Sequence, residues 1–172
     1  MKNALLVIDY QKDFVDGALG FPGAEKLEPI IIEHVKKAIS NKDEVIFTYD
    51  THEANYLETE EGKNLPVVHC IKGSEGWKLY GKLNEYVKDA TVFDKPTFGS
   101  LELGNYLKDK EFEVITIVGL VSNICVISNA IIAKAALPNA HIVVDSKATA
   151  SFDPELNQKT MDVLKGLQIE VI

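Results

Sequence analysis

Short apolar runs that alternate with amphipathic stretches constrain the fold of this chain most strongly. The runs are rich in β-branched residues and nearly continuous in apolarity, as expected of strands that are covered on both faces. The candidate strands are Ala4–Asp9, Glu44–Asp50, Thr91–Asp94, Glu113–Gly119, Ala140–Asp145 and Ile169–Ile172. The stretches between them predict helices over Ala24–Asn41, Trp77–Lys88, Leu101–Lys110, Ser122–Leu137 and Pro154–Leu167. Strands that alternate with helices predict a three-layer α/β/α fold around a six-stranded, mostly parallel sheet.

Length and composition limit the class of protein. A chain of 172 residues is long enough for one well-buried domain and short for two, so we expect a single domain over residues 1–172. The formal net charge of −8 argues against nucleic acid or an anionic membrane surface as a partner. No apolar stretch approaches the roughly 18–20 residues that span a bilayer, and the N-terminal apolar run is too short for a secretory signal. The two cysteines suggest no disulfide framework, so we expect the protein to reside in a reducing compartment, the cytoplasm.

Three reactive side chains stand at the carboxyl ends of different predicted strands, where ligands bind in open α/β sheets. Asp9 closes the first strand, Lys95 follows the third, and Cys125 lies after a glycine turn where a helix is expected to begin. Unpaired N–H groups at a helix start lower the pKa of a thiol and can hold an oxyanion. Each residue alone also has a structural explanation: a turn-capping carboxylate, a solvated lysine, a buried cysteine. Their coincidence favours nucleophilic catalysis.

Three segments carry a resemblance to a known superfamily: Val7–Phe14, Asp94–Pro96 and Val118–Val126. In order and spacing they resemble the isochorismatase-like cysteine hydrolases, which include the nicotinamidases. The resemblance implies a Rossmann-like parallel sheet flanked by helices, in agreement with the pattern above. It also implies a catalytic triad, with Cys125 as nucleophile, Lys95 favouring the thiolate and Asp9 taking the thiol proton.

The same resemblance implies how the oxyanion and the substrate are held. In the family a cis peptide bond precedes the nucleophile, and it matches Leu120–Val121 here. The backbone N–H groups of Val121 and Cys125 would then form the oxyanion hole. Leu120 is also expected to contact the substrate. Phe14 matches an aromatic residue that lies against the substrate ring in relatives, although packing under the first loop explains it equally well.

A metal site is expected beside the triad. Asp50 and His52 end the second predicted strand. In extended backbone, side chains two positions apart point to the same side, so these two side chains are expected to converge. His69 follows in the long irregular stretch Thr51–Gly76, and such loops tend to carry function. Imidazole and carboxylate ligands suit Zn²⁺, Mn²⁺ or Fe²⁺, of which we expect zinc, although hydrogen-bonded loop histidines are an alternative on spacing alone.

The resemblance supports this metal site and leaves its last ligand open. Asp50, His52 and His69 match the metal positions of nicotinamidases. Many relatives have a further histidine in the loop, and this chain has none there. Glu61 is the first candidate for the remaining ligand, followed by Glu58 and by water.

The function implied is hydrolysis of a small carboxamide, nicotinamide first, to the acid and ammonia through a thioester, by a homo-oligomer. One alternative within the superfamily is hydrolysis of another amide, a ureido compound or an isochorismate-like vinyl ether. A second alternative is a non-catalytic binding protein on the same fold. A flavodoxin-like or receiver module is a weaker third.

Overall fold

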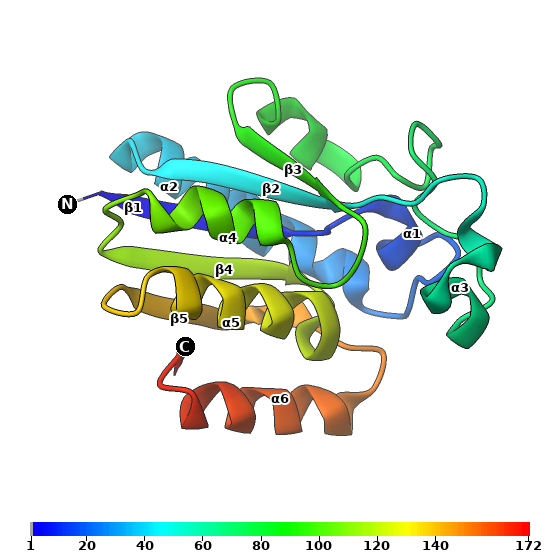
Figure 1. The fold of residues 1–172 in the computed structure, drawn as a ribbon. Coiled ribbons are helices and arrows are strands. Elements are labelled where there is room, and N and C mark those ends of the chain that lie inside the picture. Colours follow the sequence, from blue (N-terminus) through cyan, green and yellow to red (C-terminus); the bar gives the residue numbers. More distant parts are fainter. Residues whose placement is uncertain (1) are drawn as a thin grey trace.

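The computed structural model describes residues 2–172 and confirms the alternation of strands and helices (Figure 1). The strands are β1(Asn3–Ile8), β2(Glu44–Asp50), β3(Thr91–Lys95), β4(Val114–Leu120), β5(His141–Ala150) and β6(Glu170–Val171). They form one six-stranded sheet in the order β3-β2-β1-β4-β5-β6, and every neighbouring pair is parallel. Each predicted strand is present, with ends that differ from the predictions by a few residues.

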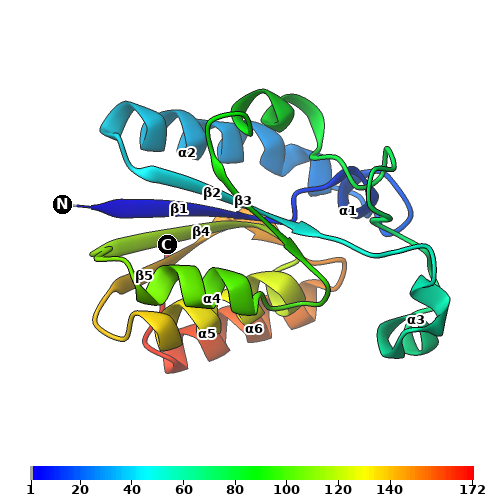
Figure 2. The same cartoon turned by 45° about the horizontal axis from the view of Figure 1, so that its top comes forward.

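Helices cover both faces of the sheet, as the three-layer prediction requires. They are α1(Lys12–Val15), α2(Glu28–Asn41), α3(Glu60–Asn64), α4(Leu101–Lys108), α5(Ile127–Ala136) and α6(Pro154–Gly166). Figure 2 shows α2 on one face and α4, α5 and α6 on the other. Between residues 2 and 172, no helix combines the length and the apolar character needed to cross a membrane.

The pleat of the strands divides the core into two halves. Leu5 and Val7 of β1 pack with the buried residues of α2, whereas Leu6 and Ile8 pack with those of α4, α5 and α6. Successive side chains of a strand point to opposite faces, so a central strand needs apolar residues at both sets of positions. This requirement explains why β1 reads as an uninterrupted apolar run.

Three predicted helices differ from the structure. The predicted helix Ala24–Asn41 begins as a 3-10 helix, η1(Ala24–Leu27), which α2 continues. The stretch Trp77–Lys88 contains only a short 3-10 helix, η3(Gly81–Tyr86), because the backbone before it pairs with the segment after β1. In that pairing Lys12 donates its N–H to Lys78 and Tyr80 donates to Tyr10. The predicted helix Ser122–Leu137 begins with a π-helical turn, η4(Ser122–Val126), which α5 continues. The irregular stretch Thr51–Gly76 contains a 3-10 turn, η2(Tyr56–Glu58), and the short α3.

Gly119 lets β4 lie close to β1 near the ends of both strands. Its φ is +114°, and a Cβ atom built there would be 2.0 Å from the carbonyl oxygen of Ile8. Only glycine can occupy such a position without moving the backbone. The residues that follow β1 and β4 are therefore brought side by side.

Candidate active site

Asp9, Lys95 and Cys125 come together at the carboxyl edge of the sheet. Asp9 follows β1, Lys95 is the last residue of β3, and Cys125 lies in the turn η4 after β4. The Lys95 ammonium nitrogen lies 2.5 Å from Oδ2 of Asp9 and 3.5 Å from Sγ of Cys125. Asp9 and Lys95 are fully buried, and Cys125 is 4% exposed. An acid, an ammonium and a thiol thus share one site.

Burial and neighbouring charges together shift the pKa of each of these groups. Burial raises the pKa of Asp9 above its ordinary value, although the charge of Lys95 opposes the shift. For Lys95 burial acts in the lowering direction, but the charges of Asp9, Cys125 and Asp50 outweigh it, so its pKa is raised and it stays an ammonium. The pKa of the Cys125 thiol is raised well above its ordinary value by burial, against the attraction of Lys95.

The expectation that the helix start lowers the thiol pKa is therefore wrong for the free protein. Burial of the thiol, the largest cause of the shift, outweighs the attraction of the Lys95 ammonium. A neutral thiol needs a base to take its proton before it can attack a carbonyl. Asp9, which is close enough to hydrogen-bond the thiol, is placed for that task.

The turn before Cys125 has the backbone that the resemblance implies. The Leu120–Val121 peptide bond is cis. The carbonyl of Val121 accepts hydrogen bonds from the N–H groups of Ile124 and Val126, at 3.2 and 3.1 Å. Val121 lines the cavity described below, but the side chain of Leu120 is fully buried in the core that α2 covers. The alternation along β4 points the Leu120 side chain into the core, so this side chain does not line the cavity, and the expected substrate contact of Leu120 stays a prediction.

The four expected metal ligands converge beside the triad. Asp50 ends β2, His52 lies two residues later, Glu61 belongs to α3, and His69 lies in the loop that follows. Their ligand atoms all lie within 4.8 Å of one another. Oδ2 of Asp50 is 2.9 Å from Nε2 of His52 and 3.3 Å from Nε2 of His69, and Oε1 of Glu61 is 3.6 Å from each nitrogen. Glu58, the other carboxylate considered, is exposed on η2 and is not in this group.

These residues fit a divalent cation. A tetrahedral ion with bonds of 2.0–2.1 Å has ligand atoms roughly 3.3–3.4 Å apart, close to the separations above. Nδ1 of His69 is 2.7 Å from the carbonyl oxygen of Val67, so it carries the proton and Nε2 faces the carboxylates. Two buried oxygens, Oδ1 of Asp50 and Oε2 of Glu61, accept no hydrogen bond among residues 2–172, and Oδ1 of Asp50 has only a 3.5 Å ion-pair contact with Lys95. Buried carboxylate oxygens without donors are what a cation would satisfy.

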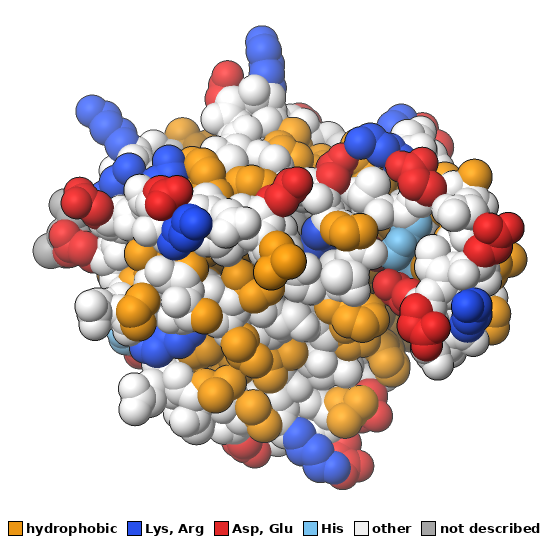
Figure 3. Space-filling model, viewed as in Figure 1, with side chains coloured by type: hydrophobic (Ala, Val, Ile, Leu, Met, Phe, Trp, Pro, Cys, Tyr) orange, Lys and Arg blue, Asp and Glu red, His pale blue; other side chains and the backbone are white. Residues whose placement is uncertain are grey.

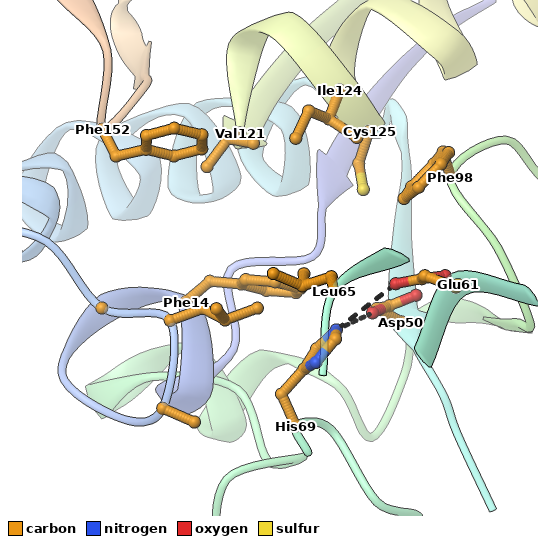
Figure 4. A pocket seen from close by; sticks show the side chains of 13 residues that line it. Phe14, Asp50, Glu61, Leu65, His69, Phe98, Val121, Ile124, Cys125 and Phe152 are labelled. Atoms are coloured by element: carbon orange, nitrogen blue, oxygen red, sulfur yellow. Dashed lines mark ion pairs between the residues drawn. The ribbon is translucent and has the colours of Figure 1, made fainter. Parts of the chain in front are cut away.

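A cavity of about 520 Å³ joins the thiol to the metal ligands. In Figure 4 the sulfur of Cys125 points into it from above, and Asp50, Glu61 and His69 lie opposite, at its lower edge. The rest of the lining is mainly apolar: Phe14, Ala18, Leu19, Leu65, Phe98, Val121, Ile124 and Phe152. Figure 3 shows histidine atoms in a hollow beside α3, between apolar and acidic side chains. The cavity suits a small, flat, largely apolar molecule that carries a polar group.

Two aromatic residues, Phe14 and Trp77, lie at or near the candidate site. Phe14 lines the cavity and also packs in the core, with its ring 5.6 Å from that of His69, so its core packing is confirmed and its contact with a substrate ring stays a prediction. Trp77 packs on the ring of Tyr49 at 4.9 Å and donates its indole N–H to Thr51. It therefore supports the start of the loop that carries the metal ligands.

The isochorismatase domain family matches residues 3–172. The chain belongs to the isochorismatase family. The family therefore accounts for nearly the whole chain, including every residue of the candidate site.

Relatives within the isochorismatase family have closely similar lengths and folds. The uncharacterized isochorismatase family protein PncA of Bacillus subtilis is 34% identical over 170 residues, which cover 90% of each chain. The crystal structure of nicotinamidase/pyrazinamidase PncA from Bacillus subtilis superposes with a TM-score of 0.87 and 30% identity over 99% of both chains. Pyrazinamidase of Pyrococcus horikoshii, in complex with zinc, shares the fold with a TM-score of 0.88 and 22% identity, over 100% of this chain and 99% of that one.

Gln11 is a site residue of this family member to which the sequence analysis gave no role. It is fully buried, and its amide nitrogen donates to the backbone carbonyls of Asp50, at 2.9 Å, and Trp77, at 2.8 Å. Its amide oxygen accepts the N–H of Asp50 at 2.8 Å. The side chain thus acts as a strand partner for the peptide groups of a metal ligand. The sequence carried one signal for this role, namely a glutamine two residues after Asp9, the last residue of the first predicted strand.

Replacing Gln11 by leucine is expected to weaken metal binding and stability together. The variant leaves the N–H and C=O of Asp50 buried without partners, at a cost of about 1–3 kcal/mol for each group. Metal affinity is expected to fall roughly 10–100-fold, as for other residues that orient ligands. Chelator competition and urea unfolding measure the two effects. Gln158→Leu on α6 is the matched control, because this exposed glutamine bonds only Asp162 and should change neither quantity. Equal losses in the two variants would contradict this role of Gln11.

Proposed function

We propose that this isochorismatase-family protein is a cysteine-dependent amidohydrolase that converts nicotinamide to nicotinate and ammonia. The observation that carries the proposal is the position of the Cys125 sulfur, 3.5 Å from the Lys95 ammonium, at one end of a cavity whose other end holds four metal-ligating side chains. The likeness to a Bacillus subtilis nicotinamidase/pyrazinamidase at 30% identity over 99% of both chains supports the choice of substrate.

The first half of the reaction forms a thioester. Asp9 takes the proton of the Cys125 thiol as the sulfur attacks the amide carbon. Lys95 stabilises the negative charge that passes through this site, and Thr48 holds the Asp9 carboxylate by a hydrogen bond of 2.6 Å. The carbonyl oxygen becomes an oxyanion, which the N–H groups of Val121 and Cys125 bind. Asp9 then returns the proton to the departing nitrogen, and ammonia leaves.

The second half releases the acid. Asp9, now ionised again, takes a proton from a water molecule, whose oxygen attacks the thioester carbon. The C–S bond breaks, the sulfur leaves as thiolate and regains a proton, and nicotinate is released. The same carboxylate therefore serves as base in both halves, and a pKa raised by burial suits that role.

Asp50, His52, Glu61 and His69 are the proposed ligands of a divalent metal, zinc first, with manganese or iron as alternatives. When bound, the metal would supply a Lewis acid that coordinates a ring nitrogen of the substrate and so orients the amide. The chain itself contributes the apolar walls on which the ring lies, with Phe14 among them.

Replacing Glu61 by glutamine is expected to lower zinc affinity at least roughly tenfold, because the site loses one of its two negative charges. Glu58→Gln is the matched control, since Glu58 lies three residues earlier, is exposed and is outside the ligand group. Competition with a chromogenic chelator measures the affinity, and metal analysis gives the stoichiometry. Equal affinities for the two variants would remove Glu61 from the proposed ligand set.

A panel of substrates tests the function itself. Purified protein loaded with zinc is incubated with nicotinamide, other small amides, ureido compounds and isochorismate, and ammonia or product is measured. We expect nicotinamide to give the highest kcat/KM and chelation to reduce it. Turnover of isochorismate without metal would favour the isochorismatase alternative. Absence of turnover with every compound would favour a binding protein.

A further inference from the structure

Asn129 joins the backbone of Cys125 to the loop that follows Lys95. It lies on α5, four residues after Cys125, and is fully buried. Its side-chain nitrogen donates to the carbonyl of Cys125 at 2.8 Å and to the carbonyl of Phe98 at 3.0 Å. Its side-chain oxygen accepts the N–H of Ser100 at 3.0 Å. Both amide donors and the amide oxygen are thus engaged, on two segments far apart in the sequence.

The contacts around Asn129 form a closed ring. The ammonium of Lys95 donates to the carbonyl of Thr97 at 3.0 Å, in the same loop that Asn129 binds at Phe98. Asn129 in turn holds the carbonyl of Cys125, and the Cys125 sulfur lies 3.5 Å from Lys95. The distance between the Cys125 thiol and the Lys95 ammonium therefore depends on two features. One is the position of the ends of β3 and β4, and the other is the set of hydrogen bonds made by the Asn129 side-chain amide.

A second observation shows that the loop rests directly on α5. A Cβ atom at Gly99 would lie 2.6 Å from Cδ1 of Ile132, so a larger residue there would have to displace the Ile132 side chain. Ser100 then begins α4, with its hydroxyl accepting the N–H of Leu103 at 3.1 Å. The segment between Lys95 and α4 is thus held against the helix that follows the nucleophile, and Asn129 supplies the side-chain hydrogen bonds between them.

We infer that Asn129 is a positioning residue, which holds the loop after Lys95 against the turn η4 that carries Cys125. It thereby fixes the distances among Lys95, Cys125 and Phe98 of the cavity wall. The inference rests on the proposed function for its kinetic test. A misplacement of reacting groups by about 1 Å can cost about 100-fold in rate, so a link of this kind has a measurable effect. Phe98 is 43% exposed at the cavity, and without the link its loop would loosen.

Two substitutions separate this role from ordinary helix packing. In Asn129→Thr, the hydroxyl can still donate to the carbonyl of Cys125, four residues back, but it cannot reach Phe98 and Ser100. In Asn129→Ala both connections are lost. A matched control is Thr160→Val on α6, which removes a buried bond of the same spacing, to the carbonyl of Leu156 at 2.8 Å, outside the candidate site.

The experiment compares the metal-loaded wild-type protein with these three variants. Circular dichroism and thermal melting establish that each is folded. We expect Asn129→Thr and Asn129→Ala to lower kcat for nicotinamide roughly 10–100-fold with a smaller change in KM, and Thr160→Val to change neither. Chymotrypsin should cleave after Phe98 faster in both Asn129 variants, because the loop is released, and at the wild-type rate in Thr160→Val.

A further measurement does not depend on the substrate. Alkylation of Cys125 by iodoacetamide, followed by peptide mass spectrometry, should be slower in both Asn129 variants, because Lys95 no longer attracts the thiolate from a fixed position. Wild-type protein that alkylates and resists chymotrypsin as expected, yet does not hydrolyse nicotinamide, would contradict the proposed function alone. Asn129→Thr with wild-type kcat, cleavage rate and alkylation rate would overturn the positioning role and leave the proposed function standing.

Discussion

Cys125→Ala is expected to abolish hydrolysis of nicotinamide, with kcat/KM falling roughly 10⁴-fold or more, as when other covalent nucleophiles are removed. The variant has no atom that can form the thioester, and the alternative attack by unactivated water is slow. Stopped-assay detection of ammonia and nicotinate measures the loss. Because the substitution removes a single buried atom, the protein should remain folded, and circular dichroism checks this.

The second cysteine provides the control for that result. Both cysteines are free thiols, but Cys70 is fully buried in the core and does not line the cavity, so alkylating reagents and substrate should not reach it. Cys70→Ala should therefore retain activity, and iodoacetamide should inactivate it as it does the wild-type protein. Persistent hydrolysis in Cys125→Ala would exclude the thioester mechanism, whatever the behaviour of Cys70.

Lys95→Met is expected to lower the free energy of unfolding by about 3–5 kcal/mol, the usual cost of breaking a fully buried ion pair. The ammonium lies 2.5 Å from Asp9 and 3.5 Å from Asp50, and without it two buried carboxylates remain with no positive side chain from Lys95 beside them. Urea unfolding at neutral pH measures the change. Activity should be lost as well, because the thiolate has no remaining positive side chain beside it.

A double variant distinguishes charge from packing in this prediction. Asp9→Asn combined with Lys95→Met removes both members of the pair, so most of the lost stability should return although the protein stays inactive. A Lys95→Met protein as stable as the wild type would show that Asp9 takes up a proton at little cost. A double variant no more stable than the single one would assign the loss to packing.

Much of the fold followed from the sequence because its signals are local. The runs in β1, β2 and β4 are apolar at both sets of alternating positions, which only strands covered on both faces require. The meeting of Asp9, Lys95 and Cys125 was likewise accessible, because parallel strands bring their carboxyl ends to one edge. Two further residues, Asp50 and His52, were placed by the two-residue period of extended backbone.

The remaining features depend on contacts between distant segments. The helix predicted from Trp77 is mostly absent because its backbone bonds the segment after β1. The thiol pKa of Cys125 is raised because the complete fold buries it, which no local motif reveals. The amides of Gln11 and Asn129 are ordinary polar residues in sequence, and only the folded backbone shows which peptide groups they satisfy.

The sequence by itself determined the parallel sheet, the order of its elements and the strand ends at which the reactive side chains stand, since hydrophobic periodicity is a property of neighbouring residues. Only the tertiary structure decided that Glu61 rather than Glu58 lies with Asp50, His52 and His69, that Leu120 points into the core, and that Asn129 binds the loop after Lys95. These depend on distances and burial between segments tens of residues apart, which the packing of the whole chain sets.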